Sequence, residues 1–146
     1  MYQVIKTKFS IIKEASKNRI HDENAVLALC KDMATMAQES LQIITLNAKN
    51  FMIDRHLITL GLVNQSLVHM REVLKPCILD SAVSFIAVHN HPSGDLTPSV
   101  EDIKITRKLI EASKIVEIPI LDHVIIGRRD SKDYCLSMNE KGICQF

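Results

Sequence analysis

The sequence lacks the features that mark several common classes of protein. Its 18 lysine and arginine residues nearly balance its 17 aspartate and glutamate residues, so the formal charge is only +1. That balance argues against a dedicated nucleic-acid-binding protein, which is normally strongly basic. No uninterrupted apolar run approaches the roughly 18 residues of a membrane span, and no repeat or low-complexity tract is found. These absences favour a compact domain that does not enter a membrane.

The cysteine residues form no recognisable motif. Four are present, at positions 30, 77, 135 and 144, and no two of them form a C-x-x-C pair. The chain also begins without the cationic and apolar regions of a secretory signal, so we expect a cytoplasmic protein. Cys30 and Cys77 lie in apolar surroundings, which predicts that they are small core residues.

Length and composition predict one domain with one core, because the 146 residues are 47% hydrophobic. We divide the chain into an N-terminal arm or strand over residues 1–20 and a domain over residues 21–146. Met1 to Lys8 has a weak period-two pattern, typical of a strand. Basic residues cluster in this part of the chain, and we interpret them as a solvated face rather than a DNA contact.

The apolar pattern predicts helices and strands that interleave without a strict βαβ rhythm. This is typical of an α+β (or α/β) domain of three layers, with helices flanking a mixed, mostly antiparallel sheet. Helices are expected over residues 23–37, 71–80 and 99–113. Strands are expected over 41–46 and 51–60, which form a hairpin, and over 84–88, 120–126 and 134–138.

A possible metal site follows the apolar run that ends at Val88. His89 and His91 are one residue apart, and alternate strand residues project to the same face. A Pro/Gly turn leads to Ser99, the expected helix cap, and to Asp102 in the first helical turn. Two imidazoles and one carboxylate suit Zn²⁺, with water in the fourth tetrahedral position, which is the arrangement of a catalytic site.

This segment resembles a known family. The spacing of His89, His91, Ser99 and Asp102 matches the JAMM (JAB/MPN-type) metalloprotease signature. The stretch His-Asn-His-Pro-Ser-Gly, together with Leu121 to Gly127, is similar to the bacterial RadC branch. The similarity extends from about Glu23 to Gly127. It implies a cytidine-deaminase-like, three-layer fold and a zinc-dependent hydrolase.

Hydrolysis of an amide also requires a general acid/base. Three glutamates are candidates: Glu39, Glu72 and Glu101. The resemblance implies Glu39, which stands between the first helix and the first strand; the alternative for Glu39 is a surface residue at a helix end. Glu72 either reaches the site or pairs with Arg71. Glu101 adjoins a ligand, and its simplest role is to complement the helix dipole.

The roles of three further groups of residues remain open or lie outside the site. Ser99 is a helix cap, and the resemblance also implies that it stabilises the oxyanion. Asp122 and His123 either orient a ligand or form a structural pair. The other histidines, at positions 21, 56 and 69, have no spacing to the motif and are expected on the surface or in loops.

The sequence departs from the RadC pattern in two places. Met70 stands where such chains often have proline, so we expect a different local turn there. The sequence shows no helix-hairpin-helix module such as longer RadC proteins carry, which weakens a DNA-repair role. The first hypothesis is a zinc-dependent hydrolase acting on a peptide or protein of unknown identity. The second is a non-catalytic, metal-containing accessory protein in DNA repair or mobile-element functions. The sequence does not specify an oligomeric state.

Overall fold

The computed structural model describes residues 13–63 and 66–146. The predicted strand Met1 to Lys8 lies outside the described residues. Among those described, five strands form one sheet, in the order β2-β1-β3-β4-β5. The strands are β1 (Ser40–Leu46), β2 (Met52–Leu60), β3 (Ser84–Asn90), β4 (Ile120–Arg129) and β5 (Lys132–Ser137).

The sheet is mixed and mostly antiparallel, as predicted. β1 pairs antiparallel with both β2 and β3, and β4 pairs antiparallel with β5. β3 and β4 are parallel, and the connection between them contains α3 (Val100–Val116). Such a connection is expected, because parallel neighbours need a long crossover. The central strand β3 is buried along its whole length.

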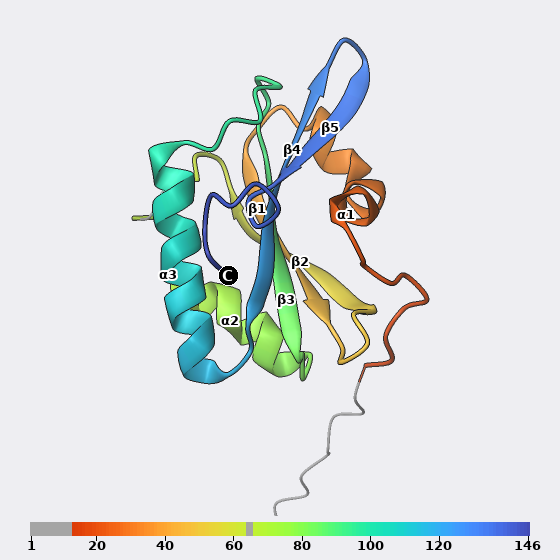
Figure 1. Ribbon diagram of the computed structural model, residues 1–146, viewed down its shortest axis with the longest axis vertical. Coiled ribbons are helices and arrows are strands. Elements are labelled where there is room, and N and C mark those ends of the chain that lie inside the picture. The colour runs from red at the N-terminus through yellow and green to blue at the C-terminus, as the bar shows by residue number, and fades with distance from the viewer. Residues whose placement is uncertain (1–12, 64–65) are drawn as a thin grey trace, which may run out of the picture.

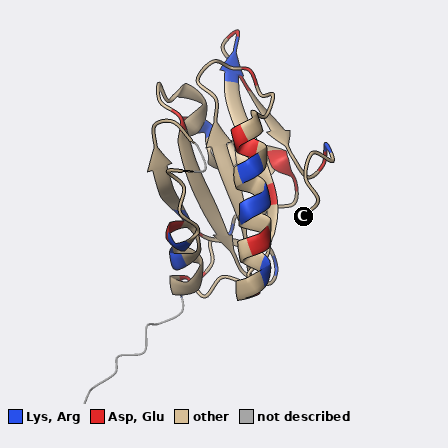
Figure 2. Cartoon of the chain, turned by 90° about the vertical axis from the view of Figure 1, so that its left-hand side faces the viewer, with Lys and Arg blue, Asp and Glu red and all other residues tan. Residues whose placement is uncertain are grey.

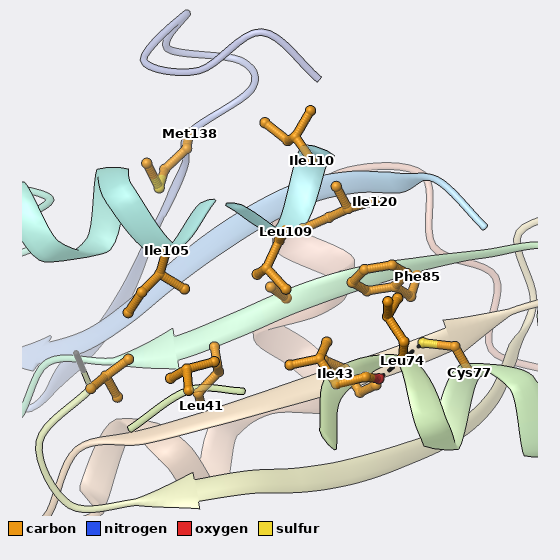
Figure 3. Packing of buried hydrophobic residues seen from close by; sticks show 14 of the residues in the cluster. Leu41, Ile43, Leu74, Cys77, Phe85, Ile105, Leu109, Ile110, Ile120 and Met138 are labelled. Atoms are coloured by element: carbon orange, nitrogen blue, oxygen red, sulfur yellow. Dashed lines mark hydrogen bonds between the residues drawn. The ribbon is translucent and has the colours of Figure 1, made fainter. Parts of the chain in front are cut away.

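Helices cover both faces of the sheet, which gives the expected three layers. α2 (Met70–Leu79) and α3 lie on one side and α1 (Glu23–Leu29) on the other (Figure 1). Alternate residues of each buried strand therefore enter different cores. On β3, Phe85 and Ala87 join the core under α2 and α3, whereas Ile86 and Val88 join the core under α1. Figure 3 shows the first of these cores.

One predicted helix is divided in two. We expected a continuous helix from Glu23 to Ala37, but α1 ends at Leu29 and a separate 3₁₀ helix, η1, spans Lys31–Thr35. Cys30 leaves the helical conformation at φ −116° and ψ 25°, and its N–H still bonds to the carbonyls of Val26 and Leu27. The break keeps both Cys30 and Met33 fully buried. Packing on the sheet therefore overrides the helical periodicity.

The long helix α3 has one buried face and one charged face. Ile105, Leu109 and Ser113 are buried against the sheet, and Figure 2 shows residues of both charge signs along the helix. Cys30 and Cys77 are fully buried, as expected for core residues. None of the helices in the described parts of the chain is long and apolar enough to cross a bilayer.

Helix α3 offers a matched test of this packing. Ile105 is fully buried and Ile115 is 83% exposed. We expect Ile105→Ala to lower the free energy of unfolding by about 2–5 kcal/mol, because it opens a cavity. Ile115→Ala should change it by no more than about 0.5 kcal/mol. Urea unfolding monitored by circular dichroism measures both, and equal effects would contradict the described orientation of α3.

Candidate metal centre

The end of β3 and the start of α3 bring the predicted ligands together. His89 is the penultimate residue of β3, and His91 is the first residue after the strand. His89 is 1% exposed. The His91 N–H continues the ladder to β4 by donating to the Ile126 carbonyl at 2.8 Å. Strand pairing thus fixes the backbone at both histidines.

Two glycines allow the turn after His91 to pack on β4. Gly94 has φ +78°, and a Cβ there would lie 2.3 Å from the Arg128 carbonyl oxygen. A Cβ on Gly127 would lie 3.2 Å from the Gly94 Cα and 3.3 Å from the His91 carbonyl oxygen. This turn also holds the His91 ring, because His91 Nδ1 lies 2.6 Å from the Asp95 carbonyl oxygen. This contact makes Nδ1 the donor, so Nε2 remains as the ligand atom.

The N-terminus of α3 places the third candidate ligand. Ser99 and Asp102 form a capping box, in which the Ser99 hydroxyl accepts from the Asp102 N–H at 3.1 Å. The Ser99 N–H donates to Asp102 Oδ2 at 2.7 Å. The Asp102 side chain is therefore turned back from the helix, as predicted, and is 2% exposed.

The three side chains converge closely. Asp102 Oδ1 lies 3.2 Å from His89 Nδ1, and Asp102 Oδ2 lies 3.3 Å from His91 Nε2. One nitrogen of each imidazole and one carboxylate oxygen all lie within 4.8 Å of one another. In a tetrahedral site with ligand bonds near 2.1 Å, two ligand atoms are about 3.4 Å apart. The donor atoms are therefore spaced closely enough to bind one ion.

The hydrogen bonding of His89 also fits a metal. Both of its ring nitrogens are buried and have no hydrogen-bond partner among the described residues. Buried polar atoms are normally satisfied, so such atoms call for an explanation. A bound cation would supply a partner for one of these nitrogens.

The charges of the cluster are strongly coupled. Burial alone would raise the pKa of Asp102, but its contacts with His89 and His91 outweigh burial and hold this pKa far below its usual range. Burial would lower the pKa of His91, but Asp102 and the Asp95 carbonyl outweigh it and raise the pKa. A carboxylate that stays ionised between two imidazoles is what a divalent cation requires.

Strand register places Glu39 beside this cluster. In the antiparallel β1–β3 pair, Leu41 lies opposite His89, so Glu39, two residues earlier, approaches the position of His91. Glu39 Oε2 lies 3.7 Å from His89 Nε2 and accepts from the Val63 N–H at 3.2 Å. A pocket of about 420 Å³ opens here, lined by Glu39, Leu62, Val63, His91, Ser93, Asp95, Thr97, Ser99, Glu101 and Asp102.

The other two candidate glutamates have salt-bridge partners. Glu72 Oε1 lies 3.3 Å from Arg71 Nε, and Glu72 is not among the residues that line the pocket. Glu101 does line the pocket, but its carboxylate accepts from Lys104 Nζ at 3.1 Å. The Glu39 carboxylate, by contrast, lies 3.7 Å from a ring nitrogen of His89.

Asp122 and His123 point to opposite faces of β4. Asp122 accepts from the Ser137 hydroxyl at 2.5 Å and from the Asn139 N–H at 3.0 Å, so it fixes the chain after β5. His123 is fully buried on the α3 side, with its ring centroid 5.9 Å from that of His89. Its Nδ1 lies 2.6 Å from the Thr106 hydroxyl, which also bonds to the Asp102 carbonyl.

His123 contacts the cluster as an uncharged ring. Burial, and then the neighbouring His89, lowers the pKa of His123 to about 3. A neutral imidazole adds no positive charge next to a prospective cation. His123 therefore packs between the helix and the strands that carry the cluster without opposing metal binding.

A second histidine-carboxylate cluster lies elsewhere, and it corrects one prediction. His56 was expected on the surface or in a loop, but it lies on β2 with Nε2 2.6 Å from Asp80 Oδ2. Asp54, His56 and Asp80 also have ligand atoms within 4.8 Å of one another. Here the carboxylates already have partners, because Lys13 bridges Asp54 and Asp80, and the Thr45 hydroxyl donates to Asp80 at 2.6 Å. We interpret this cluster as a structural ion-pair network.

Comparisons with known proteins agree with these observations. The family of RadC-like JAB domains matches residues 20–143. A UPF0758 protein of Caldanaerobacter subterraneus subsp. tengcongensis is 45% identical over 124 residues, which are 85% of this chain and 52% of that protein. UPF0758 proteins of Bacillus pumilus and Geobacillus thermodenitrificans are 44% and 48% identical over 120 residues, or 82% of this chain. These matches cover 52% and 51% of the two relatives, so the chain spans about half their length.

The tight turn can be tested with two glycines of positive φ. Gly94→Ala and Gly142→Ala both force alanine into a left-handed conformation, which costs about 1 kcal/mol. Only at Gly94 would the new Cβ also meet backbone, because nothing lies within 4 Å at Gly142. We expect Gly94→Ala to lower the free energy of unfolding by at least about 1 kcal/mol more than Gly142→Ala, as measured by urea unfolding. Equal losses would contradict the close packing of the turn on β4.

The ion-pair network predicts a dependence on pH. Burial would raise the pKa of Asp80, but the Thr45 hydroxyl and His56 outweigh it and lower this pKa below the usual value. Asp80 then stabilises the fold above about pH 4, and this contribution disappears as the pH falls through the lowered pKa. We expect Asp80→Asn to be less stable than the natural chain at pH 7 and the difference to shrink toward pH 3. Urea unfolding at each pH measures it, and a constant difference would contradict the assignment.

Proposed function

Because the chain belongs to the RadC-like JAB domain family, we propose that it is a zinc-dependent hydrolase of peptide or isopeptide bonds. His89, His91 and Asp102 hold the ion in this proposal. The observation that carries it is the convergence of two buried imidazoles and one ionised carboxylate, with His89 lacking any hydrogen-bond partner among the described residues. Nitrogen and carboxylate donors in this number suit Zn²⁺ and leave a position for water.

A zinc ion bound there would polarise the substrate carbonyl and lower the pKa of a water molecule to about 7. The proton transfers are carried out by side chains that line the pocket. Glu39 takes a proton from the water molecule as the water oxygen attacks the carbonyl carbon. Glu39 then passes that proton to the amine nitrogen as the C–N bond breaks. Its position supports this role, since its carboxylate faces both the pocket and His89.

Ser99 has a second role in this proposal. Its oxygen accepts the Asp102 N–H, which completes the helix cap. The cap does not use the hydroxyl hydrogen, and Ser99 lines the same pocket as Glu39. The hydroxyl donates to the carbonyl oxygen as negative charge develops on it.

The substrate in this proposal is a peptide or protein segment that enters the pocket beside Glu39. The pocket is lined by several polar and charged side chains and by Leu62 and Val63. The chain spans about half the length of the relatives that it matches, so the activity of the whole relatives is a separate question. A non-catalytic accessory role, with the metal kept for structure, is the alternative that the experiments must separate.

The two histidine-carboxylate clusters provide the metal test and its control. We expect protein purified without added zinc to contain one zinc ion per chain, measured by plasma mass spectrometry. His91→Ala should lose at least 90% of that zinc, because it removes one of three ligands. His56→Ala, in the ion-pair network, should keep it. Zinc that follows His56 rather than His91 would overturn the assignment of the metal centre.

Catalysis is tested by replacing the proposed base. We expect Glu39→Gln to keep its zinc and to cleave a library of peptides and isopeptide-linked peptides at least about 100-fold more slowly, the usual contribution of a general acid/base. Glu72→Gln, which removes a carboxylate outside the pocket, should retain the natural rate. Full activity in Glu39→Gln would end this proposal for Glu39. One zinc per chain with no cleavage by the natural protein would favour the accessory role.

A further inference from the structure

The middle residue of the His-Asn-His stretch was not among the candidate site residues. Asn90 is the last residue of β3, and its side chain points to the opposite face of the sheet from His89. It is 1% exposed. A buried amide has to find hydrogen-bond partners, and those of Asn90 show what it holds.

Within the described residues, the Asn90 side chain makes three hydrogen bonds, and all of them go to the residues on either side of Glu39. Asn90 Oδ1 accepts from the Ser40 N–H at 2.7 Å and from the Ser40 hydroxyl at 2.8 Å. Asn90 Nδ2 donates to the Gln38 carbonyl at 2.9 Å. These bonds join parts of the chain that are 50 and 52 residues apart.

The bonds lie where pairing between the two strands ends. The β1–β3 register runs from Leu46 and Ser84 to Leu41 and His89. Beyond this last pair, the Asn90 side chain binds Ser40, the first residue of β1, and Gln38, which precedes the strand. Glu39 is thereby fixed between two anchored neighbours, while its own carbonyl accepts from Gly61 at 2.8 Å.

The chemistry of this contact requires an amide. It must accept two hydrogen bonds at one end and donate one at the other, and Asn90 does both within one short side chain. Aspartate keeps the two acceptors but cannot donate to Gln38, and it brings a buried charge. Leucine has a similar volume but leaves the Gln38 carbonyl and the buried N–H and hydroxyl of Ser40 without these hydrogen bonds, and an unsatisfied buried group is costly.

We propose that Asn90 is a positioning residue that sets Glu39 against the metal centre from the far face of β3. This rests on the proposed function, in which Glu39 is the general acid/base. The end of β3 thus positions both a metal ligand and the general acid/base. His89 faces the metal centre directly, and Asn90 holds the glutamate through the backbone of β1.

The test compares Asn90→Leu with Asn47→Leu. Asn47 lies in the turn after the other end of β1, where its side chain accepts from the Lys49 and Phe51 N–H groups at 2.9 and 3.0 Å. The control therefore removes an asparagine that hydrogen-bonds at the opposite end of β1, away from Glu39. Asn90→Asp is a second variant, which keeps the two acceptors.

The first readout needs neither metal nor substrate. The Val63 N–H donates to the Glu39 carboxylate, so its hydrogen exchange reports where that carboxylate lies. We expect the Val63 amide to exchange at least about 10-fold faster in Asn90→Leu, with a smaller increase in Asn90→Asp and none in Asn47→Leu. Unchanged exchange at Val63 in Asn90→Leu would overturn the proposal.

The second readout uses cobalt(II) in place of zinc, because the visible spectrum of the ion reports on the groups around it. Cobalt affinity in Asn90→Leu should stay within about 3-fold of the natural protein, since the ligands are intact. The pH at which the spectrum changes should move in the same direction as in Glu39→Gln. A loss of affinity greater than about 10-fold, the size expected when a ligand loses its support, would mean that Asn90 acts on the histidines instead.

The outcomes separate this inference from the proposed function. If Glu39→Gln leaves the pH dependence of the cobalt spectrum unchanged, the role of Glu39 as base loses its support. If Glu39→Gln shifts it and the Asn90 variants do not, the positioning role is wrong and the proposed function stands. If Asn90→Leu and Asn90→Asp are both unfolded by circular dichroism, Asn90 serves the fold as a whole, and the proposal is overturned.

Discussion

The site depends on how the central strand β3 pairs with its two neighbours. Antiparallel pairing with β1 puts Leu41 opposite His89, and this register brings Glu39 to the end of β3. Parallel pairing with β4 puts His123 opposite Ala87, two residues before His89 on the same face. A shift of one residue in either pair would turn every side chain to the other face of the sheet. The strand is buried along its length on both faces, so burial of its apolar residues holds this register.

The ligands could be predicted from the sequence because they depend on local structure. Strand alternation relates His89 to His91, and a helix cap turns Asp102 back, so three residues within 14 positions need no distant information. The proline and glycine residues that mark the turn are also visible in the sequence. The same holds for the hairpin of β1 and β2 and for the apolar strands β3 and β4.

The remaining features depend on contacts between distant segments. Glu39 was proposed from family resemblance, since no local pattern links it to residues 50 positions later. Asn90 was missed because its partners become visible only when β1 and β3 are paired. His56 was expected on the surface or in a loop because its partner, Asp80, belongs to another element. The first helix is divided at Cys30 because of its packing on the sheet. This packing cannot be predicted from the helical spacing of apolar residues.

The two histidine-carboxylate clusters differ in their unused hydrogen-bonding capacity, although their residue types are the same. At Asp80, Thr45, His56 and Lys13 satisfy the carboxylate, so a cation would have to displace bonds that already exist. At Asp102, one carboxylate lies 3.2–3.3 Å from both imidazoles, and within the described residues neither ring nitrogen of His89 forms a hydrogen bond. A cation entering there gains ligands and removes an unfavourable state, because unsatisfied buried atoms are costly. Donor types alone therefore do not identify a metal centre, whereas donor types together with unused bonding capacity do.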